Sequence, residues 1–280
     1  ISGKPELFKL KRFNVAIIDE ASQILEPQLL PILTATTANG KDAIERFVLI
    51  GDHKQLPAVV LQKKQEAVVQ SDVLRRQGIE NLTISFFERL YRANAGKDFT
   101  VWLTKQGRMH PDIARFPSEV FYKGRLGSLG LHHQLDPNVP LKLDSSYRIV
   151  NRVSFIPSEA ELSSHSYKVN RSEACIIAEI LRELEESNQL SSEEIATRVG
   201  IITPYRCQIA LIKQYLKEKG VSQSEDVLVD TVERFQGSER DLIFYSFCVN
   251  QPYQLSYLSV LNEDEGQLID KKLNVALTRA

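Results

Sequence analysis

The sequence predicts an α/β protein with mainly parallel sheets, divided into two domains. Short apolar runs that do not alternate with polar residues, such as 15–18 and 242–245, are typical of parallel strands buried on both faces. Segments with apolar residues at helical spacing lie between these runs, as expected of βαβ units. The 280 residues also exceed the length at which one hydrophobic core usually stops growing, so we expect two sheets, separated near residue 100.

In the first half, the strand at 15–18 is followed by a second apolar run at 47–50, which ends at Gly51. Glycine permits a tight exit from a strand. The other expected elements are an amphipathic segment at 24–34, a polar loop at 39–40, helices within 62–98 that break at 94–96, and a third strand at 101–103.

In the second half, residues 126–146 are rich in Gly, Pro, His and Asn and predict a long connection. Asn170, followed three residues later by Glu173, resembles a capping box at the start of a helix. Gly220 is a suitable residue just beyond the end of the next helix. The expected elements are strands at 199–202, 227–229 and 242–245, and helices that contain 177–184 and 209–216.

The composition, 42% hydrophobic and 25% charged, is that of a soluble globular protein. No apolar run approaches the roughly 20 residues of a membrane helix, and residues 1–12 are too charged for a secretory signal. Cys175, Cys207 and Cys248 are far apart and form no CxxC pair, which argues against a disulfide framework and a zinc site. We therefore expect an intracellular protein, cytoplasmic or nuclear, with no membrane partner.

The chain has a net charge of −1, so it lacks the excess of basic residues that nucleic-acid-binding proteins usually show. Basic residues outnumber acidic ones in 105–125, whereas 183–194 is acidic. A modest basic face and an ordinary solvated surface both fit this distribution.

Asp19 and Glu20 directly follow the first expected strand and should therefore lie at the carboxyl edge of its sheet, where α/β proteins hold ligands. A carboxylate there suits a magnesium ion that keeps most of its waters. A second carboxylate can activate an attacking water. The alternative is that both acids cap a following helix.

Gln55 follows the second expected strand, within the sequence GDHKQLP. A neutral amide can hydrogen-bond both to a phosphate oxygen and to an attacking water, and so sense a γ-phosphate. The alternative is a solvated side chain in a strand-to-turn loop. The position of the loop, after the next strand beyond Asp19 and Glu20, favours the functional interpretation.

Arg108 lies in QGRMHP, near the start of the second half. Its planar fork of donors matches phosphate oxygens, so it could act as an arginine finger. A pairing with a surface carboxylate is the alternative. His110 has no nucleophile nearby in the sequence, and we expect it to pack or to begin a helix.

Further polar residues follow the later strands. Thr203 and Arg206 lie at a strand end and at the start of a proline-opened helix, where hydroxyls and amides can hold a backbone phosphate. Gly237 lets a ligand approach the backbone closely, and Glu239 can accept hydrogen bonds from a ribose hydroxyl. Arg279 is expected to point off the end of the last helix, toward a nucleotide in the opposite domain.

Six segments together resemble superfamily 1 helicases, and are most similar to the up-frameshift and senataxin-like branch, which moves 5′ to 3′ on a single strand. They resemble helicase motifs II, III, IV, the loop before V, V and VI, in that order along residues 13–280. They are DEASQ, GDHKQLP, QGRMHP, TPYR, VDTVERFQGSE and KKLNVALTRA. Residues 166–173 also resemble the approach of that branch to its second domain.

The resemblance implies two RecA-like P-loop NTPase domains with mainly parallel sheets, the first incomplete (1–100, motifs II and III) and the second complete apart from its end (101–280, motifs IV to VI). It implies an ATP-dependent translocase that uses ATP and Mg²⁺, binds single-stranded DNA or RNA, and is monomeric. ATP would bind between the domains. The implied roles are Asp19 and Glu20 at the metal, Glu20 as the base, Gln55 as the γ-phosphate sensor, Arg108 and Arg279 for charge stabilisation, Gln236, Gly237 and Glu239 at the nucleotide, and Thr203, Arg206 and Thr231 at the nucleic-acid backbone.

The sequence departs from the family pattern in several places. No GxxxxGK[ST] loop occurs, and Pro5 in SGKP lacks both a hydroxyl and a backbone donor, so we expect an N-terminal part upstream and almost no hydrolysis by this segment alone. Gly107 replaces a common tyrosine, which removes a stacking surface. Lys271 and Lys272 replace an arginine pair and lose its fork. The segment 253–267 is longer than is usual in the family, and we expect it to form a surface insertion.

Two other interpretations remain open. A non-catalytic binding scaffold with this fold would predict substitutions at the acids or arginines. Those positions, however, are all filled by the expected side chains. A different P-loop enzyme, such as a nuclease–helicase fusion or a DNA-independent ATPase, is the other interpretation. DNA and RNA are not distinguished, because both would be held mainly through the backbone.

Overall fold

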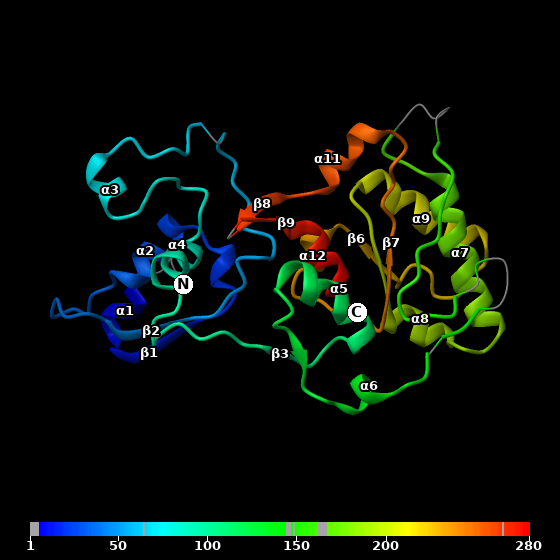
Figure 1. Cartoon of the computed structure of the whole chain (residues 1–280), viewed down its shortest axis with the longest axis horizontal. Coiled ribbons are helices and arrows are strands. Elements are labelled where there is room, and N and C mark those ends of the chain that lie inside the picture. The colour runs from blue at the N-terminus through cyan, green and yellow to red at the C-terminus, as the bar shows by residue number, and fades with distance from the viewer. Residues whose placement is uncertain are drawn as a thin grey trace. The chain divides into compact units, whose positions relative to one another are not determined.

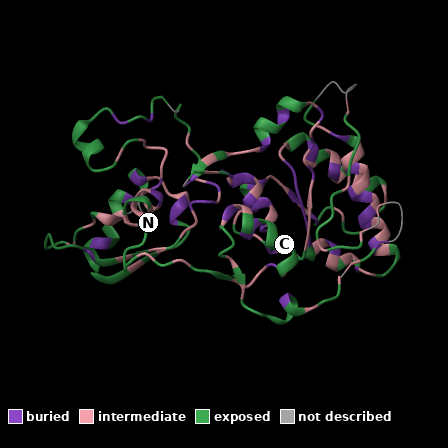
Figure 2. Ribbon diagram, viewed as in Figure 1, coloured by how far each residue is buried: buried purple, intermediate pink, exposed green. Residues whose placement is uncertain are grey.

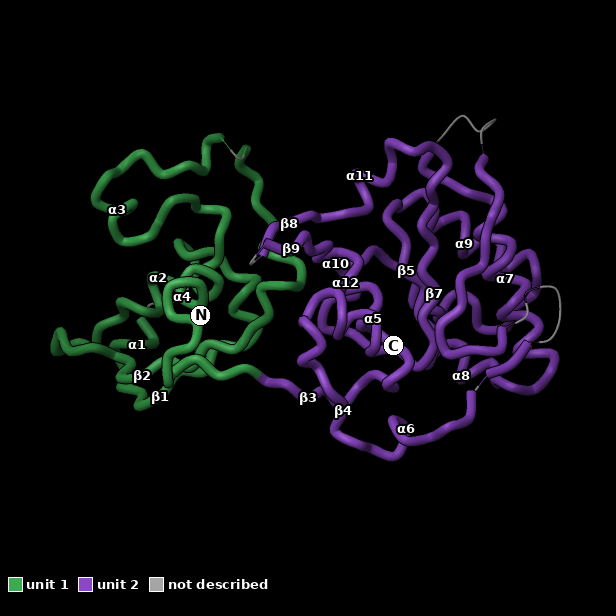
Figure 3. Tube along the Cα trace, viewed as in Figure 1, with its two compact units in different colours: residues 1–102 green, residues 103–280 purple. Residues whose placement is uncertain are grey.

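The computed structural model describes residues 6–63, 65–139, 141–143, 147, 149–161, 167–264 and 266–280. It divides into two compact units, Ile1–Trp102 (unit 1) and Leu103–Ala280 (unit 2), shown in Figure 3. Both contain parallel strands with helices in the connections, so the predicted α/β class is confirmed (Figure 1). Among the described helices, none is long and apolar enough to cross a membrane.

Unit 1 is built on a parallel pair of strands in which Ile18 lies opposite Leu49. Because the strands are parallel, the residues that follow Ile18 and those that follow Leu49 leave the same edge. The described elements are α1 (Glu6–Leu10), β1 (Phe13–Ile18), η1 (Ala21–Gln23), α2 (Glu26–Leu33), β2 (Ile44–Leu49), α3 (Asp72–Arg76) and α4 (Phe86–Asn94).

One face of this sheet is packed and the other is exposed. Phe8 of α1 and Ile32 of α2 belong to the same apolar cluster as Ala16 of β1. On the opposite face, Val15 and Ile17 are 46% and 67% exposed, as Figure 2 shows for the strands. The prediction that this strand is buried on both faces is therefore wrong for the described residues, because the helices cover one face of the pair.

Unit 2 contains a parallel three-stranded sheet of order β6-β5-β7, with a parallel pair β3-β4 and an antiparallel hairpin β8-β9. Its strands are β3 (Lys105–Gln106), β4 (Gly127–Ser128), β5 (Val199–Ile202), β6 (Leu228–Asp230), β7 (Leu242–Tyr245), β8 (Leu261–Asp264) and β9 (Gln267–Asp270). Its helices are α5 (Pro111–Phe121), α6 (His132–Leu135), α7 (Arg171–Glu186), α8 (Ser192–Arg198), α9 (Arg206–Glu218), α10 (Val232–Phe235), η2 (Pro252–Gln254), α11 (Leu255–Leu258) and α12 (Lys271–Leu277).

The core of unit 2 lies between α7, α9 and the central strand β5. Ile177 and Leu181 of α7 and Ile212 of α9 are at most 5% exposed and belong to one cluster with Ile201 of β5. The predicted strands at 199–202 and 242–245 and the predicted helices that contain 177–184 and 209–216 are confirmed, as is the left-handed Gly220 (φ 72°) after α9. Asn170 caps α7 by accepting from the Glu173 N–H at 2.8 Å, but the predicted capping box does not form. The Asn170 N–H donates to Gln208 instead, and the Glu173 carboxylate accepts from Ser246 and the Cys248 N–H. The strand predicted at 227–229 is observed at Leu228–Asp230.

Three local predictions need correction or completion. No strand forms at 101–103, where Val101 and Leu103 are both 79% exposed; pairing begins only at Lys105, which lies opposite Gly127. The described part of the connection at 126–146 contains β4 and α6. Residues 2–5, 64, 140, 144–146, 166 and 265 belong to segments that carried predictions, and they lie outside the described residues.

Candidate active site

The acidic pair of unit 1 lies in a tight turn that leaves the end of β1. Glu20 has a left-handed backbone (φ 51°), and its N–H donates to Asp19 Oδ1 at 2.9 Å. Gln23 Nε2 donates to Glu20 Oε2 at 2.7 Å. The Ala21 N–H donates to the carbonyl of Ile50 at 2.8 Å, which holds this turn against the end of β2.

Gly51 and Asp52 bring the second segment against the first. A Cβ on Gly51 would lie 2.9 Å from the Ser22 backbone nitrogen, so a larger residue would separate the two turns. The Asp52 N–H donates to Ser22 Oγ at 3.2 Å. The structure therefore places the ends of the two strands side by side.

Gln55 is held within its own loop. Its Nε2 donates to Asp52 Oδ2 at 3.2 Å, and the Lys54 N–H donates to Asp52 Oδ1 at 2.9 Å. The loop is anchored by His53, whose ring stacks on Tyr91 with centroids 4.6 Å apart. The amide of Gln55 is therefore positioned at the edge where Asp19 and Glu20 also lie.

The carboxylates of Asp19 and Glu20 are exposed and offer hard oxygen donors, which is the ligand chemistry that magnesium prefers. Magnesium usually takes one or two carboxylates, substrate phosphates and several waters, rather than a cage of protein ligands. The described residues contain no cluster of three or more His, Cys, Asp or Glu side chains that could enclose a metal. The donor set of Asp19 and Glu20 thus fits a hydrated magnesium ion.

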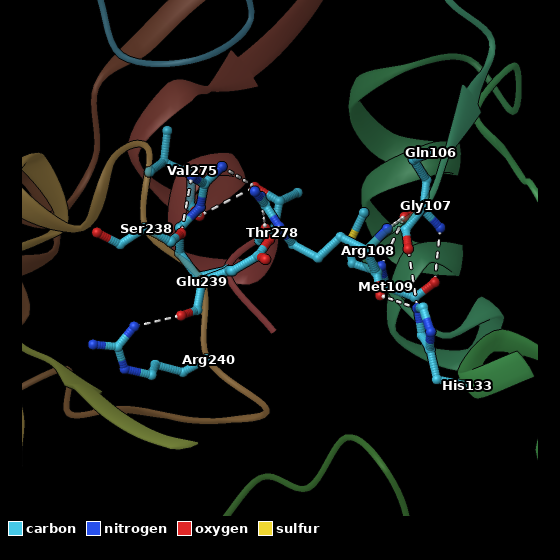
Figure 4. A network of polar contacts seen from close by, with 11 residues as sticks. Gln106, Gly107, Arg108, Met109, His133, Ser238, Glu239, Arg240, Val275 and Thr278 are labelled. Carbon is cyan, nitrogen blue, oxygen red and sulfur yellow. Dashed lines mark hydrogen bonds and ion pairs between the residues drawn. The ribbon is translucent and has the colours of Figure 1, made fainter. Parts of the chain in front are cut away.

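In unit 2, Arg108 links three segments that are far apart in the sequence (Figure 4). Its Nε donates to Glu239 Oε2 at 2.5 Å, and its Nη1 donates to the Thr278 carbonyl at 2.9 Å. The segment before α5, the loop before β7 and the end of α12 therefore meet at one guanidinium.

Neighbouring residues hold the backbone around Arg108. Gln106 Oε1 accepts from the N–H groups of Arg108 and Met109 at 2.9 and 2.7 Å. Gln134 Nε2 donates to the carbonyls of Gln106 and Met109, both at 3.0 Å, and His133 Nε2 lies 3.0 Å from the Gly107 carbonyl. The supports from Gln134 and His133 have no signal in the sequence, because they contact main-chain atoms 25 or more residues away.

His110 begins α5, where its Nδ1 accepts from the Asp112 N–H at 3.2 Å. The predicted helix-entry role is confirmed. Lys272 lies in the interior and forms an ion pair with Glu233 at 2.9 Å, which ties α12 to α10. Superfamily 1 helicases, which the sequence resembles, usually have an arginine at this position. Here Lys272 fills the position and joins two helices of unit 2.

Arg279 is only 3% exposed. Its Nε donates to the Val275 carbonyl at 2.9 Å, and its Nη2 donates to Thr278 Oγ1 at 3.0 Å. The side chain folds back along the last turn of α12, whereas the sequence suggested that it would extend from the helix end. The C-terminal carbonyls of a helix lack intrahelical donors and attract a guanidinium, which explains this direction.

The residues predicted at the nucleotide follow α10. Gly237 has φ 82° and is exposed, and a Cβ added there would meet no atom within 4 Å, so its backbone is accessible. Gln236 is half-buried, and its Nε2 has no hydrogen-bond acceptor within the described ranges. Glu239, two residues after Gly237, forms an ion pair with Arg108.

The residues predicted at nucleic acid gather at the carboxyl edge of the unit 2 sheet. The Thr203 N–H donates to the Asp230 carbonyl at 3.1 Å, and the Thr231 N–H donates to Asp230 Oδ1 at 2.8 Å. Thr203 is fully buried, and its hydroxyl has no partner among the described residues. Arg206, the first residue of α9, is exposed.

Parallel α/β units with acids, an amide and arginines at loop and strand ends define a nucleotide-binding class of protein. Two family models match the chain, both described as an AAA domain, over residues 82–280 and 1–63. The chain therefore belongs to the family of these helicase-type AAA domains. This agrees with the six motifs, which predict a superfamily 1 helicase.

Similar curated proteins, two of them named as helicases, support this family assignment. The chain is 32% identical to "Regulator of nonsense transcripts 1 homolog" of Neurospora crassa, over 100% of the chain and 23% of the relative. It is 32% identical to "Helicase sen1" of Schizosaccharomyces pombe, over 96% of the chain and 14% of the relative. It is 30% identical to "ATP-dependent helicase upf1" of the same yeast, over 100% and 27%. The chain thus spans about a quarter or less of the length of these relatives.

Proposed function

We propose that this chain carries the motor of an ATP-dependent translocase that moves 5′ to 3′ along single-stranded DNA or RNA. The observation that carries the proposal is the contact between two strand ends in unit 1. There the Asp19–Glu20 turn bonds to Ile50, and Ser22 bonds to Asp52 beside Gln55. Polar groups at the carboxyl edge of a parallel sheet are where such folds bind ligands.

In this proposal, unit 1 belongs to the first RecA-like domain. Asp19 holds the hydration shell of magnesium, Glu20 orients and deprotonates the attacking water, and Gln55 contacts the γ-phosphate. Magnesium, when bound, neutralises charge on the phosphates. The exposed carboxylate of Glu20, supported by Gln23 at 2.7 Å, has the geometry of a base that is oriented but still accessible.

Unit 2 forms the second RecA-like domain. Arg108 stabilises the negative charge that develops on the transferred phosphate, and Arg279 does so after its side chain turns away from the Val275 carbonyl, to which it donates in this structure. Glu239 binds the ribose and Gln236 and Gly237 line the nucleotide. The ion pair between Arg108 and Glu239 supports this assignment, because it brings two groups with predicted nucleotide contacts to within 2.5 Å of each other.

Thr203, Arg206 and Thr231 bind the backbone of the single strand in this proposal. Their location at the ends of β5 and β6 supports it. Contacts of this kind read phosphate and sugar, so the proposal covers both DNA and RNA. We expect the protein to act as a monomer.

The test is ATP hydrolysis by the purified full-length protein, with and without single-stranded oligonucleotides, at defined salt. We expect magnesium-dependent turnover that a single strand stimulates, and displacement of a strand from duplexes with a 5′ overhang. Binding of the oligonucleotide without any turnover would instead favour a non-catalytic scaffold.

A further inference from the structure

The segment between β7 and β8 is anchored to the body of unit 2 by a buried glutamine. Gln254, 2% exposed, donates from Nε2 to the Tyr167 carbonyl at 2.7 Å. Its Oε1 accepts from the N–H groups of Asn250 and Gln251, both at 2.9 Å. The turn that leads into η2 and α11 therefore has a fixed conformation.

Asn250 provides a second anchor and is 4% exposed. Its Nδ2 donates to the Val169 carbonyl at 2.7 Å, and its Oδ1 accepts from the Glu161 N–H at 2.8 Å and from Asn170 Nδ2 at 3.0 Å. A network in which each member is hydrogen-bonded makes a rigid support. The exposed side chains of η2 and α11 are therefore carried on a backbone with a fixed position.

These elements present aromatic rings. Tyr253 and Tyr257 are 55% and 66% exposed, and their rings meet edge to face with centroids 6.2 Å apart. Leu258 on the inner side of α11 is buried, so the segment has a packed face and an aromatic outer face. Exposed aromatic rings on a rigid support suit binding to the flat faces of nucleic-acid bases.

The segment that carries the aromatic pair contacts the start of α9, which holds Arg206 of the edge proposed for the single strand. Gln254 Nε2 also lies 3.4 Å from the Tyr205 hydroxyl, at the start of α9. Arg206 follows directly, is exposed, and forms no ion pair in the part of the chain that the structure describes. Tyr167, which accepts from Gln254, is itself 45% exposed. Cationic and aromatic side chains together match a polyanion with stacked bases.

We propose that Tyr253 and Tyr257 form a stacking platform that extends the nucleic-acid site of unit 2, with the backbone held at Arg206 and bases packed on the two rings. This inference rests on the proposed function and adds a base-contacting surface to it. Stacking on a ring is tolerant of sequence, because every base has a flat face. The platform therefore lengthens the bound site without adding a sequence preference.

The experiment measures binding of fluorescein-labelled single-stranded oligonucleotides of increasing length to the full-length protein by anisotropy. The Y253A/Y257A variant should bind long oligonucleotides about tenfold more weakly, the scale of one lost base–aromatic stack. Y253F/Y257F keeps both rings and should bind within about twofold of the parent. L255A, which removes another exposed apolar side chain of α11, is the matched control and should bind like the parent.

The outcomes separate the two proposals. If the parent protein binds no oligonucleotide, the proposed function fails. If the parent binds and Y253A/Y257A binds equally well at every length, the platform is wrong while the proposed function stands. ATP hydrolysis without nucleic acid should be the same in all four proteins, and equal melting temperatures will show that the aromatic variants are folded.

Discussion

Arg108 and Glu239, which are 131 residues apart in the sequence, form an ion pair at 2.5 Å in unit 2. Their side chains are 34% and 66% exposed, and an ion pair with this much solvent contact adds little to stability. The guanidinium can therefore exchange a carboxylate for a phosphate at low cost. Its contact with the Thr278 carbonyl at 2.9 Å keeps it oriented during such an exchange.

We predict that Arg108→Ala lowers ATP turnover by about a thousandfold or more, the scale reported for loss of an arginine finger. Arg108→Lys should also be strongly impaired, because lysine keeps the charge but loses the planar fork. Steady-state hydrolysis at saturating ATP measures both. Arg115→Ala removes an exposed arginine paired with Glu119 and is the control. Turnover by Arg108→Lys equal to the parent would contradict the role.

Glu20→Gln should reduce turnover by about a hundredfold or more, because a positioned general base typically contributes this much. Nucleotide binding should persist, since the amide keeps the size and the contact with Gln23. Single-turnover kinetics and binding of a fluorescent nucleotide separate the two effects. Glu45→Gln, at an exposed carboxylate in β2, is the control. Unchanged hydrolysis would remove Glu20 from its proposed role.

Gly200→Ala should destabilise unit 2 by about 1–3 kcal/mol, the usual cost of overpacking. A Cβ there would lie 2.8 Å from Phe235 Cε1 and 2.9 Å from Ile243 Cδ1. Gly127→Ala in β4 is the matched control, because its nearest neighbour would be at 3.8 Å. Thermal unfolding of both variants measures the difference. Equal melting temperatures would show that the core around β5 is less tightly packed than described.

The ionisation of Glu179 makes the free energy of unfolding depend on pH in the acid range. The Lys219 ammonium, which donates to Glu179 at 2.6 Å, lowers the pKa of this carboxyl from 4.5 to about 2. Because the folded pKa is lower than the unfolded one, the ionised carboxylate stabilises the fold above pH 4.5, and this contribution is lost as the pH falls toward 2. The parent should therefore exceed Glu179→Gln in free energy of unfolding at pH 6, and the difference should shrink at pH 3. A constant difference would contradict this coupling.

The three cysteines should react at very different rates. Burial raises the pKa of the Cys248 thiol to about 12, and burial and Glu179 raise the pKa of Cys175, so both hold little thiolate at pH 8. Cys207 is exposed at the start of α9. A thiol reagent at pH 8 should label Cys207 first, as peptide mass mapping will show, and Cys207→Ser should remove the fast phase. Fast labelling of Cys248 would show that the segment after β7 opens locally.

Features that depend on chain order could be predicted from the sequence. Parallel strands end at one edge, so the placement of Asp19 near Asp52 follows from two apolar runs and their polar ends. The direction of Arg279 could not be predicted, since it is set by the carbonyl of Val275 and the hydroxyl of Thr278 at a helix end. The exposure of Ile17 also escaped prediction, because an apolar run does not reveal how many layers cover a sheet.

Trp102 is the only tryptophan of the 280 residues. The ammonium of Lys54, the neighbour of Gln55, lies 5.8 Å from its ring centroid, and Tyr91 packs at 5.9 Å between it and His53. The indole therefore reports on the GDHKQLP loop from a single position. Its intrinsic fluorescence offers a label-free optical signal, and a change in emission when nucleotide is added would follow the motion of that loop in real time.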